Sequence, residues 1–406
     1  MTEGFGAPVL VLLVGVLVVV SMILHAGLER YRLPPLVGFL MLGFGLRIAE
    51  GHWGMPAPEL GQILQFLGKI GIITLLFRIG LESRPAELLQ RLPQASVVAL
   101  LGIVLSGGLG FIAVYYLLAQ SLVAALVLAA ALTASSVGIS VGVWQSAGAM
   151  QSPNGELLLD VAEIDDLAAI LLMALLFSIL PLLQGDGENS LLPALGQSLG
   201  EALVKLAAFA GLCLLFAFYV EKPLSGLARR FEPPQAYMLS IAGIGIILAS
   251  LAGLLGFSFA IGAFFAGLAF SRDPEAVKQE GSFLPLYDFF SPFFFIAIGY
   301  RVDPASLAAA GDAALVLFTV AVVGKVLAGL PVWHFRDFPA AAVLGLSLVP
   351  RAEIALVIMT HALQIAGVIS REMFSAMVLV SAATCLLAPV GVQFLFRKWP
   401  HVKDPG

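Results

Sequence analysis

Two adjacent carboxylates, Asp165 and Asp166, stand inside an apolar run that extends from about Leu157 to Leu180. A third carboxylate, Glu163, lies two residues before Asp165. The run is long enough to cross a bilayer, where a charged carboxylate costs roughly 2.5–3.5 kcal/mol at the centre on insertion scales. Such groups persist where they are paired, line a water-filled cavity or bind an ion. The pattern therefore indicates a site for a cation and a proton.

Neighbouring positions on a helix point about 100° apart, so Asp165 and Asp166 cannot share one proton on a single face. We expect them to have different partners, with one carboxylate facing the ion and the other facing a basic residue. The alternative is a carboxylate pair in a loop, or a purely structural ion pair.

Lys325 is a possible basic partner. It lies within another apolar run, the predicted span 311–333, and has Gly324 and Gly329 as near neighbours. Glycines let a second helix approach closely. A carboxylate partner keeps a buried lysine charged. The functional interpretation is a lysine that pairs with an aspartate and yields when the cation arrives; the alternative is a structural salt bridge.

Two further runs predict helices that are broken inside the membrane. The first carries hydroxyls in Leu132–Gly138, and the second contains Ser347–Glu353 with Pro350 at its centre. Proline removes a backbone donor and frees carbonyls, which is tolerated at membrane depth only beside a cavity or packed protein. Half-helix ends there can face a bound ion. The candidates are Thr133 and Ser135 for the cation site, and Ala134, Ser136 and Pro350 for the breaks.

Arg351 and Glu353 adjoin the second break, and Glu163 lies in the same membrane layer as the aspartate pair. We interpret these three as an ion-pair network that steadies the crossing helices, in preference to direct ligands of the ion.

Composition assigns the class of protein. Of 406 residues, 60% are hydrophobic and only 12% are charged, against about 25% charged residues in a soluble domain. The chain is therefore expected to be an all-α polytopic membrane protein. The sequence shows no Walker loop, no dinucleotide fingerprint after a strand and no HExxH motif. We expect no enzyme activity, no cofactor and no nucleic-acid partner.

Thirteen apolar runs of membrane-spanning character are predicted. Their residues are 7–26, 34–49, 60–81, 93–118, 121–147, 155–181, 194–220, 235–255, 257–271, 283–300, 311–333, 338–364 and 370–396. With the N-terminus outside, thirteen loop lysines and arginines fall inside and only Arg47, Arg301 and Arg371 fall outside. The positive-inside rule therefore predicts an outer N-terminus and a cytoplasmic C-terminus in a plasma (inner) membrane.

An internal repeat is visible between Phe77–Leu88 and Ile296–Leu307, where Gly80 matches Gly299 and Pro85 matches Pro304. The copies end spans three and ten, and an offset of seven spans gives them opposite orientations. Inverted repeats with a midplane site are the architecture of secondary transporters. We expect repeats at about 7–181 and 235–396, a linker helix at about 194–220, and paired breaks in spans five and twelve.

Taken together, these residues resemble the monovalent cation:proton antiporters, in particular the bacterial branch of Na⁺/H⁺ exchangers and Kef-type potassium efflux systems. The resemblance covers nearly the whole chain and rests on six motifs: Thr133–Ile139, Ile164–Asp166, Ile261–Leu268, Pro292–Gly299, Gly324–Lys325 and Pro350–Glu353. It implies the Na⁺/H⁺ antiporter fold, with a core of two crossed broken helices, a dimerisation domain, a homodimer and an elevator-like cycle. It also implies that Asp166 binds the cation, and that Asp165 pairs with Lys325 in the proton-loaded state.

The chain departs from that family's usual pattern at three places: Glu163 precedes the aspartate pair, Arg78 replaces an apolar residue, and Ala352 replaces a glycine. It ends about ten residues after its last span, so no soluble regulatory domain is expected.

The functional prediction is a secondary antiporter that exchanges Na⁺ or Li⁺ for protons. The alternatives are a K⁺/H⁺ antiporter, an organic-anion symporter on the same fold, and a membrane sensor without turnover. The carboxylate pair disfavours the anion carrier because it would repel an anionic substrate.

Overall fold

The computed structural model describes residues 7–31, 33–53, 57–83, 85–183, 191–220, 223, 234–255, 257–271 and 280–403. Within these ranges the chain is built of helices and has no β-strand. Each of the thirteen predicted spans lies on one helix or on an interrupted pair of helices in this part of the chain. Eight of the described helices are long and apolar enough to cross a membrane, and four shorter apolar helices accompany them. The all-helical membrane class is confirmed.

Both predicted helix interruptions are present. Span five consists of α5 (Leu122–Thr133) and α6 (Val137–Ser146), and Ala134 between them has the extended backbone angles φ −64° and ψ 135°. Span twelve consists of α17 (Phe338–Ser347) and α18 (Glu353–Gln364), with Pro350 between them. Proline at this position stops the helical hydrogen bonding, because it has no backbone N–H.

The chain forms two compact units, each assembled from both halves of the sequence. The first unit comprises Met1–Gly27, Gly38–Arg84 and Phe177–Arg301. Its helices are α1 (Ala7–Arg30), α2 (Pro35–Trp53), α3 (Ala57–Glu82), α8 (Leu191–Leu215), α10 (Pro234–Leu254), α11 (Phe259–Phe270) and α13 (Glu280–Arg301).

The second unit comprises Leu28–Val37, Pro85–Leu176 and Val302–Gly406. Its helices are α4 (Pro85–Ile112), α5, α6, most of α7 (Pro153–Leu183), α14 (Pro304–Ala309), α15 (Gly311–Ala328), α16 (Val332–Phe335), α17, α18 and α19 (Arg371–Lys398). Spans four to six thus share a unit with spans eleven to thirteen. The internal repeat pairs these spans, because its two copies are seven spans apart. The repeat boundaries themselves stay a prediction.

Backbones in the first unit touch where glycines remove the side chain. A Cβ on Gly267 of α11 would lie 2.0 Å from the carbonyl oxygen of Phe77 on α3. A Cβ on Gly80 of α3 would lie 2.1 Å from the carbonyl oxygen of Phe264 on α11. Because each glycine receives the backbone of the other helix, α3 and α11 have reciprocal close contact, which is how small residues let membrane helices pack.

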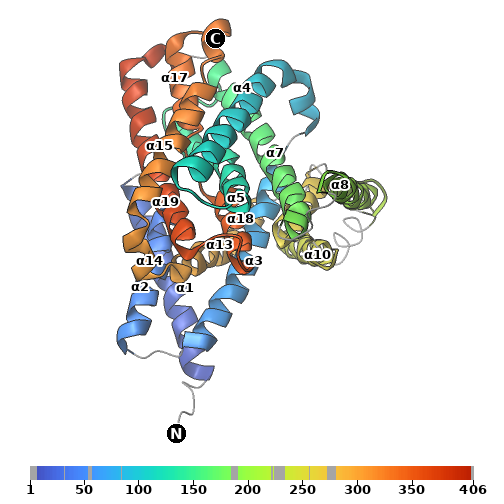
Figure 1. The fold of residues 1–406 in the computed structure, drawn as a ribbon, viewed down its shortest axis with the longest axis vertical. Coiled ribbons are helices and arrows are strands. Elements are labelled where there is room, and N and C mark those ends of the chain that lie inside the picture. Colours follow the sequence, from blue (N-terminus) through green and yellow to red (C-terminus); the bar gives the residue numbers. More distant parts are fainter. Residues whose placement is uncertain are drawn as a thin grey trace. The chain divides into compact units, whose positions relative to one another are not determined.

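The second unit has its own buried core. Trp144 of α6 is fully buried and meets Phe396 of α19 edge-on, with ring centroids 4.9 Å apart. In Figure 1, α15 and α19 lie side by side in this unit, in agreement with their contacts. Helices α4 and α15 lie close together at Gly324 of α15. A Cβ on this glycine would lie 2.8 Å from the hydroxyl oxygen of Ser106 on α4. The residue after Gly324 is Lys325, so this approach helps enclose its side chain.

We predict that Gly267→Ala destabilises the protein, because the added methyl cannot fit against the Phe77 carbonyl. Forcing extra carbon into packed structure costs about 1–3 kcal/mol. Thermal unfolding of the detergent-solubilised protein checks the prediction. Gly243→Ala on α10 is the matched control, because no atom lies within 4 Å of its added Cβ. An unchanged melting temperature for Gly267→Ala would contradict the close contact.

Candidate cation site at the crossed helix breaks

The two helix breaks of the second unit meet directly. The backbone N–H of Ser136, in the first break, donates to the carbonyl of Pro350, in the second, over 2.8 Å. Helix α5 packs on α18, while Ser140 of α6 donates its hydroxyl to the carbonyl of Ser347 at the end of α17 over 2.6 Å. The first half of each broken span therefore lies beside the second half of the other. The two spans cross with opposite chain directions.

The polar backbone groups freed at the second break are satisfied by side chains. Arg351 donates from Nη1 to the carbonyls of Leu348 and Pro350, at 3.0 and 3.2 Å. On α19, Thr384 accepts the Arg351 backbone N–H at 3.1 Å, and Ser381 donates to the Arg351 carbonyl. Without water in the hydrocarbon region, each such group needs a partner from the protein. Hydrogen bonds from the Arg351 side chain and from α19 therefore stabilise the non-helical backbone of the second break.

Asp165 is neutralised by a buried ion pair. Its Oδ2 lies 2.5 Å from Nζ of Lys325 on α15, and both side chains are fully buried. The same oxygen accepts the Ser135 hydroxyl of the first break at 2.7 Å. The structure thus brings together three predicted residues from three elements. The other oxygen, Oδ1, has no hydrogen-bond partner among the described residues, which leaves it available to a ligand.

Asp166 differs from its neighbour in every contact. Its residue is only partly buried, and its carboxylate makes no hydrogen bond or ion pair with the described part of the chain. It interacts electrostatically with Asp165, Lys325, Glu353 and Glu163. The expectation of different partners for adjacent aspartates therefore agrees with the geometry: one carboxylate holds Lys325 and the other is unpaired within the described residues.

Two members of the predicted ion-pair network, Arg351 and Glu353, have other partners among the described contacts. Glu353 accepts the Ser136 hydroxyl at 2.6 Å and makes no ion pair with Arg351 among the described residues. The guanidinium of Arg351 turns to backbone carbonyls instead, and its Nε and Nη2 have no partner in the described contacts. An interrupted helix exposes several carbonyls, and the guanidinium of Arg351 has enough donors to bond two of them at once. Glu163 is partly buried on α7 and lies within electrostatic reach of Asp166.

Thr133, also predicted as a cation ligand, uses its hydroxyl hydrogen within α5 and keeps its oxygen lone pairs. Its hydroxyl donates to the carbonyl of Ala130 at 2.7 Å, within α5 itself. It therefore satisfies the end of its own helix and makes no contact with either aspartate among the described hydrogen bonds. Ala134 is buried and supplies only the extended backbone of the break.

Sequence reasoning missed the clamp that fixes the crossing. Ser347 accepts the indole N–H of Trp144 on its hydroxyl at 2.9 Å, while its carbonyl accepts the Ser140 hydroxyl. The sequence did contain a hint of these contacts, because Trp144 and Ser140 are polar donors on the same short apolar helix, α6. Which helix they would meet could not be known from the pattern.

Sequence reasoning also missed Gly102 on α4. A Cβ there would lie 3.1 Å from Nζ of Lys325. Glycine thus lets the α4 backbone lie close to the ammonium group, on a helix that carries no charged residue of the site.

The arrangement offers oxygen ligands to a hard cation. Asp166 and the free Oδ1 of Asp165 supply carboxylate oxygens, and alkali cations prefer such donors. In the described part of the chain, no group of three or more His, Cys, Asp and Glu could hold a metal ion as a fixed cofactor.

The chain is similar to known transporters in its sequence and in its fold. The family model described as "Sodium/hydrogen exchanger, transmembrane" matches residues 15–398. The high-affinity Na⁺/H⁺ antiporter NhaS3 of Synechocystis sp. is 29% identical over 346 residues, covering 83% of this chain and 72% of that protein. An Na⁺/H⁺ antiporter of Enterococcus hirae is 28% identical over 376 residues, covering 91% and 94%. The solved sodium proton antiporter MjNhaP1 of Methanocaldococcus jannaschii shares the fold, with a TM-score of 0.68 at 15% identity and 97% coverage of both chains.

We predict that Lys325→Ala lowers thermal stability strongly, because it leaves Asp165 buried without its counter-charge. Breaking a buried pair from one side costs about 3–5 kcal/mol. The double variant Asp165→Asn/Lys325→Ala should recover much of this loss, since no unpaired charge then remains. Lys205→Ala, which changes an exposed lysine of α8, is the control. A double variant as unstable as Lys325→Ala would contradict the ion-pair interpretation.

Proposed function

Because the chain belongs to the sodium/hydrogen exchanger family of transmembrane proteins, we propose that it is a secondary antiporter exchanging Na⁺ or Li⁺ for protons. It is a multi-pass membrane protein, and its family consists of transporters rather than enzymes. The observation that carries the proposal is that the two adjacent aspartates have different contacts. Asp165 is held by Lys325, while Asp166 stands partly exposed with no partner among the described residues.

In this mechanism a proton and a cation compete for Asp166. A protonated Asp166 is neutral, and the Asp165–Lys325 pair is neutral as well, so the loaded site carries no net charge from these three groups. An arriving cation replaces the proton on Asp166 and draws on Asp165 as a second carboxylate. Lys325 then yields its place, because the cation provides the positive charge that Asp165 requires. Competition for one carboxylate couples the two flows.

Alternating access would be provided by relative movement of the two compact units, in the elevator-like manner that the family resemblance implies. The breaks, both aspartates and Lys325 all belong to the second unit. The site can therefore move as one body without rearranging its own contacts. The first unit would then act as the fixed partner and as the dimerisation surface of a homodimer.

We test the cation proposal with inside-out vesicles or proteoliposomes that hold an acidic interior, read by a pH-sensitive dye. Na⁺ or Li⁺ should dequench the dye with the unmodified protein. Asp166→Asn should reduce the response to that of vesicles without the protein, because the amide can neither carry the proton nor balance the cation. Asp160→Asn, one helical turn or more away on α7, is the control and should retain exchange.

Each remaining outcome of this assay has a definite meaning. Dequenching by K⁺ alone would keep the mechanism and change the substrate. Normal exchange by Asp166→Asn would remove Asp166 from the mechanism. No response to any alkali cation, from weakly acidic to weakly alkaline pH, would contradict the antiporter proposal and favour an anion carrier or a sensor.

The proposed orientation places the N-terminus outside and the C-terminus in the cytoplasm of a plasma (inner) membrane. It rests on the distribution of basic residues in the loops. Of the thirteen on the predicted inner side, seven lie outside the described residues: Arg32, Arg84, Lys222, Arg229, Arg230, Arg272 and Lys278.

Helix α19 tests the orientation, because exposed arginines stand near its two ends, Arg371 and Arg397. A membrane-impermeant maleimide added to intact cells should label Arg371→Cys and leave Arg397→Cys unlabelled until the membrane is opened. The native Cys213 and Cys385 are both buried, so background labelling should be low. The reverse labelling pattern would invert the topology.

A further inference from the structure

The first unit contains a second candidate site, far in sequence from the aspartates. A polar hollow of about 310 Å³ lies between the beginning of α3 and the end of α13. Its polar lining consists of Gln62 and Gln65 from α3, with Tyr300 and Arg301 from α13. Gly61 keeps the hollow open beside the tyrosine, since a Cβ there would already be 3.6 Å from the ring. The volume is at the lower end of the range found for ligand pockets.

The hollow presents an uncompensated positive charge. Arg301 makes no hydrogen bond or ion pair with any described residue. The nearby carboxylate, Glu50, is already engaged: Arg47 donates to it at 3.0 Å and the Tyr300 hydroxyl at 2.6 Å. Arg301 therefore lines the hollow together with two amide side chains that can donate hydrogen bonds. This donor set fits an anion.

The same face of α3 continues with a second positive charge. Gln62, Gln65 and Lys69 follow at intervals of three and four residues, which places them on one helix face. Lys69 lies with its Nζ 5.8 Å from the centre of the Phe259 ring, and no carboxylate pairs with it among the described contacts. The polar stripe on this face thus runs from the exposed carboxylate of Glu59, three residues before Gln62, to the positive charge of Lys69.

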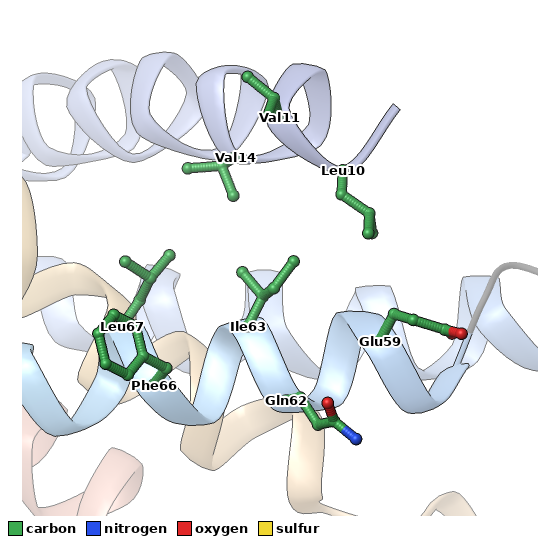
Figure 2. A pocket seen from close by; sticks show the side chains of 8 residues that line it. All are labelled: Leu10, Val11, Val14, Glu59, Gln62, Ile63, Phe66 and Leu67. Atoms are coloured by element: carbon green, nitrogen blue, oxygen red, sulfur yellow. The ribbon is translucent and has the colours of Figure 1, made fainter. Parts of the chain in front are cut away.

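An apolar groove adjoins the polar hollow at Gln62. The groove has a volume of about 610 Å³ and lies between α1 and α3. Figure 2 shows Leu10 and Val14 of α1 facing Ile63 and Leu67 of α3, while Gln62 points to the side of α3 away from α1. Both hollows thus share one residue. Together they offer polar donors next to a surface that is apolar except for Gln62 and the carboxylate of Glu59 at its end.

The depth of the hollow narrows the class of anion. It adjoins the first turns of the membrane span Glu59–Glu82 and the last turns of the span Phe283–Arg301. Because the ends of membrane-spanning helices meet the headgroup region, we expect the hollow to face lipid phosphates, which are the abundant anions there. Arginine is suited to phosphate because its planar donors can bind two oxygens at once.

We propose that this hollow binds a phosphate group, supplied by a phospholipid whose acyl chain lies along the apolar groove. Arg301 contacts the phosphate oxygens, and Gln62 and Gln65 donate to the same group. The hollow takes only the headgroup, and the α1–α3 groove takes the chain. The ligand stabilises the first unit, independently of the cation chemistry in the second.

The test is ligand-dependent thermal stability of the full-length, delipidated protein in detergent. A ligand that binds the folded protein raises its melting temperature by mass action. Short-chain phosphatidylglycerol should raise it in a saturable way, whereas diacylglycerol with the same chains and no phosphate should not. Arg301→Gln should weaken the apparent affinity for the phospholipid roughly tenfold or more, because hydrogen bonds to a charged group are lost.

Matched variants keep the test decisive. Arg371→Gln removes an exposed arginine of the second unit and should leave the lipid response unchanged. Gln65→Leu removes an amide donor without changing charge, and Arg301→Lys keeps the charge without the planar donors; both should bind more weakly than the unmodified protein. These two variants serve as the test if Arg301→Gln fails to fold.

Inorganic phosphate forms the second arm. A rise in melting temperature with inorganic phosphate that Arg301→Gln abolishes would support the phosphate site and assign it to a soluble anion. Equal responses to the phospholipid and to diacylglycerol, or equal responses of the unmodified protein and Arg301→Gln to both phosphate ligands, would overturn the proposal.

Discussion

A membrane interior supplies no water to interrupted backbone, and this constraint governs the second unit. Two spans are broken at the same depth, so each break must find its hydrogen bonds within the protein. The bond from Ser136 to Pro350 joins the breaks directly, and Arg351 and α19 serve the remaining groups. Asp165, Lys325 and Ser135 meet at this crossing because the constraint brings the breaks together. Stability and the ion site therefore depend on one set of contacts.

Two adjacent aspartates acquire different roles from the helix that bears them. Successive side chains on α7 diverge by about 100°, so one faces α15 and the other does not. In the buried pair, the charges of Asp165 and Lys325 cancel, which lowers the cost of placing them inside the membrane. Asp166 then remains as the carboxylate that can respond to ions. A pair of this kind contributes little net stability but is costly to break from one side. Asp165 can therefore release Lys325 at low cost when a cation takes its place, but not when the lysine is lost without a replacement.

The sequence was sufficient for the spans and the breaks, because hydropathy, proline and hydroxyl runs report local requirements of a chain in lipid. From the residues, it predicted only that Lys325 pairs with one of the two aspartates; the resemblance to the antiporter family singled out Asp165. It failed where the outcome depends on which surfaces meet. Arg351 and Glu353 were expected to belong to an ion-pair network, but among the described contacts the arginine donates to carbonyls and the glutamate accepts from Ser136. The Trp144–Ser347 clamp required knowledge of the crossing itself.

Gly102 adds a consequence of a different kind. Because it has no side chain, the α4 backbone lies close to the ammonium of Lys325, and a Cβ at this position would come within 3.1 Å of Nζ and 3.5 Å of the Ala328 methyl group. The lysine is therefore enclosed tightly on the α4 side, and a larger residue there would push the ammonium from its place. The position of the charge is then set by sterics as well as by electrostatics. Helix α4, which contributes no charge to the site, would in this way fix where the ammonium stands when the cation arrives.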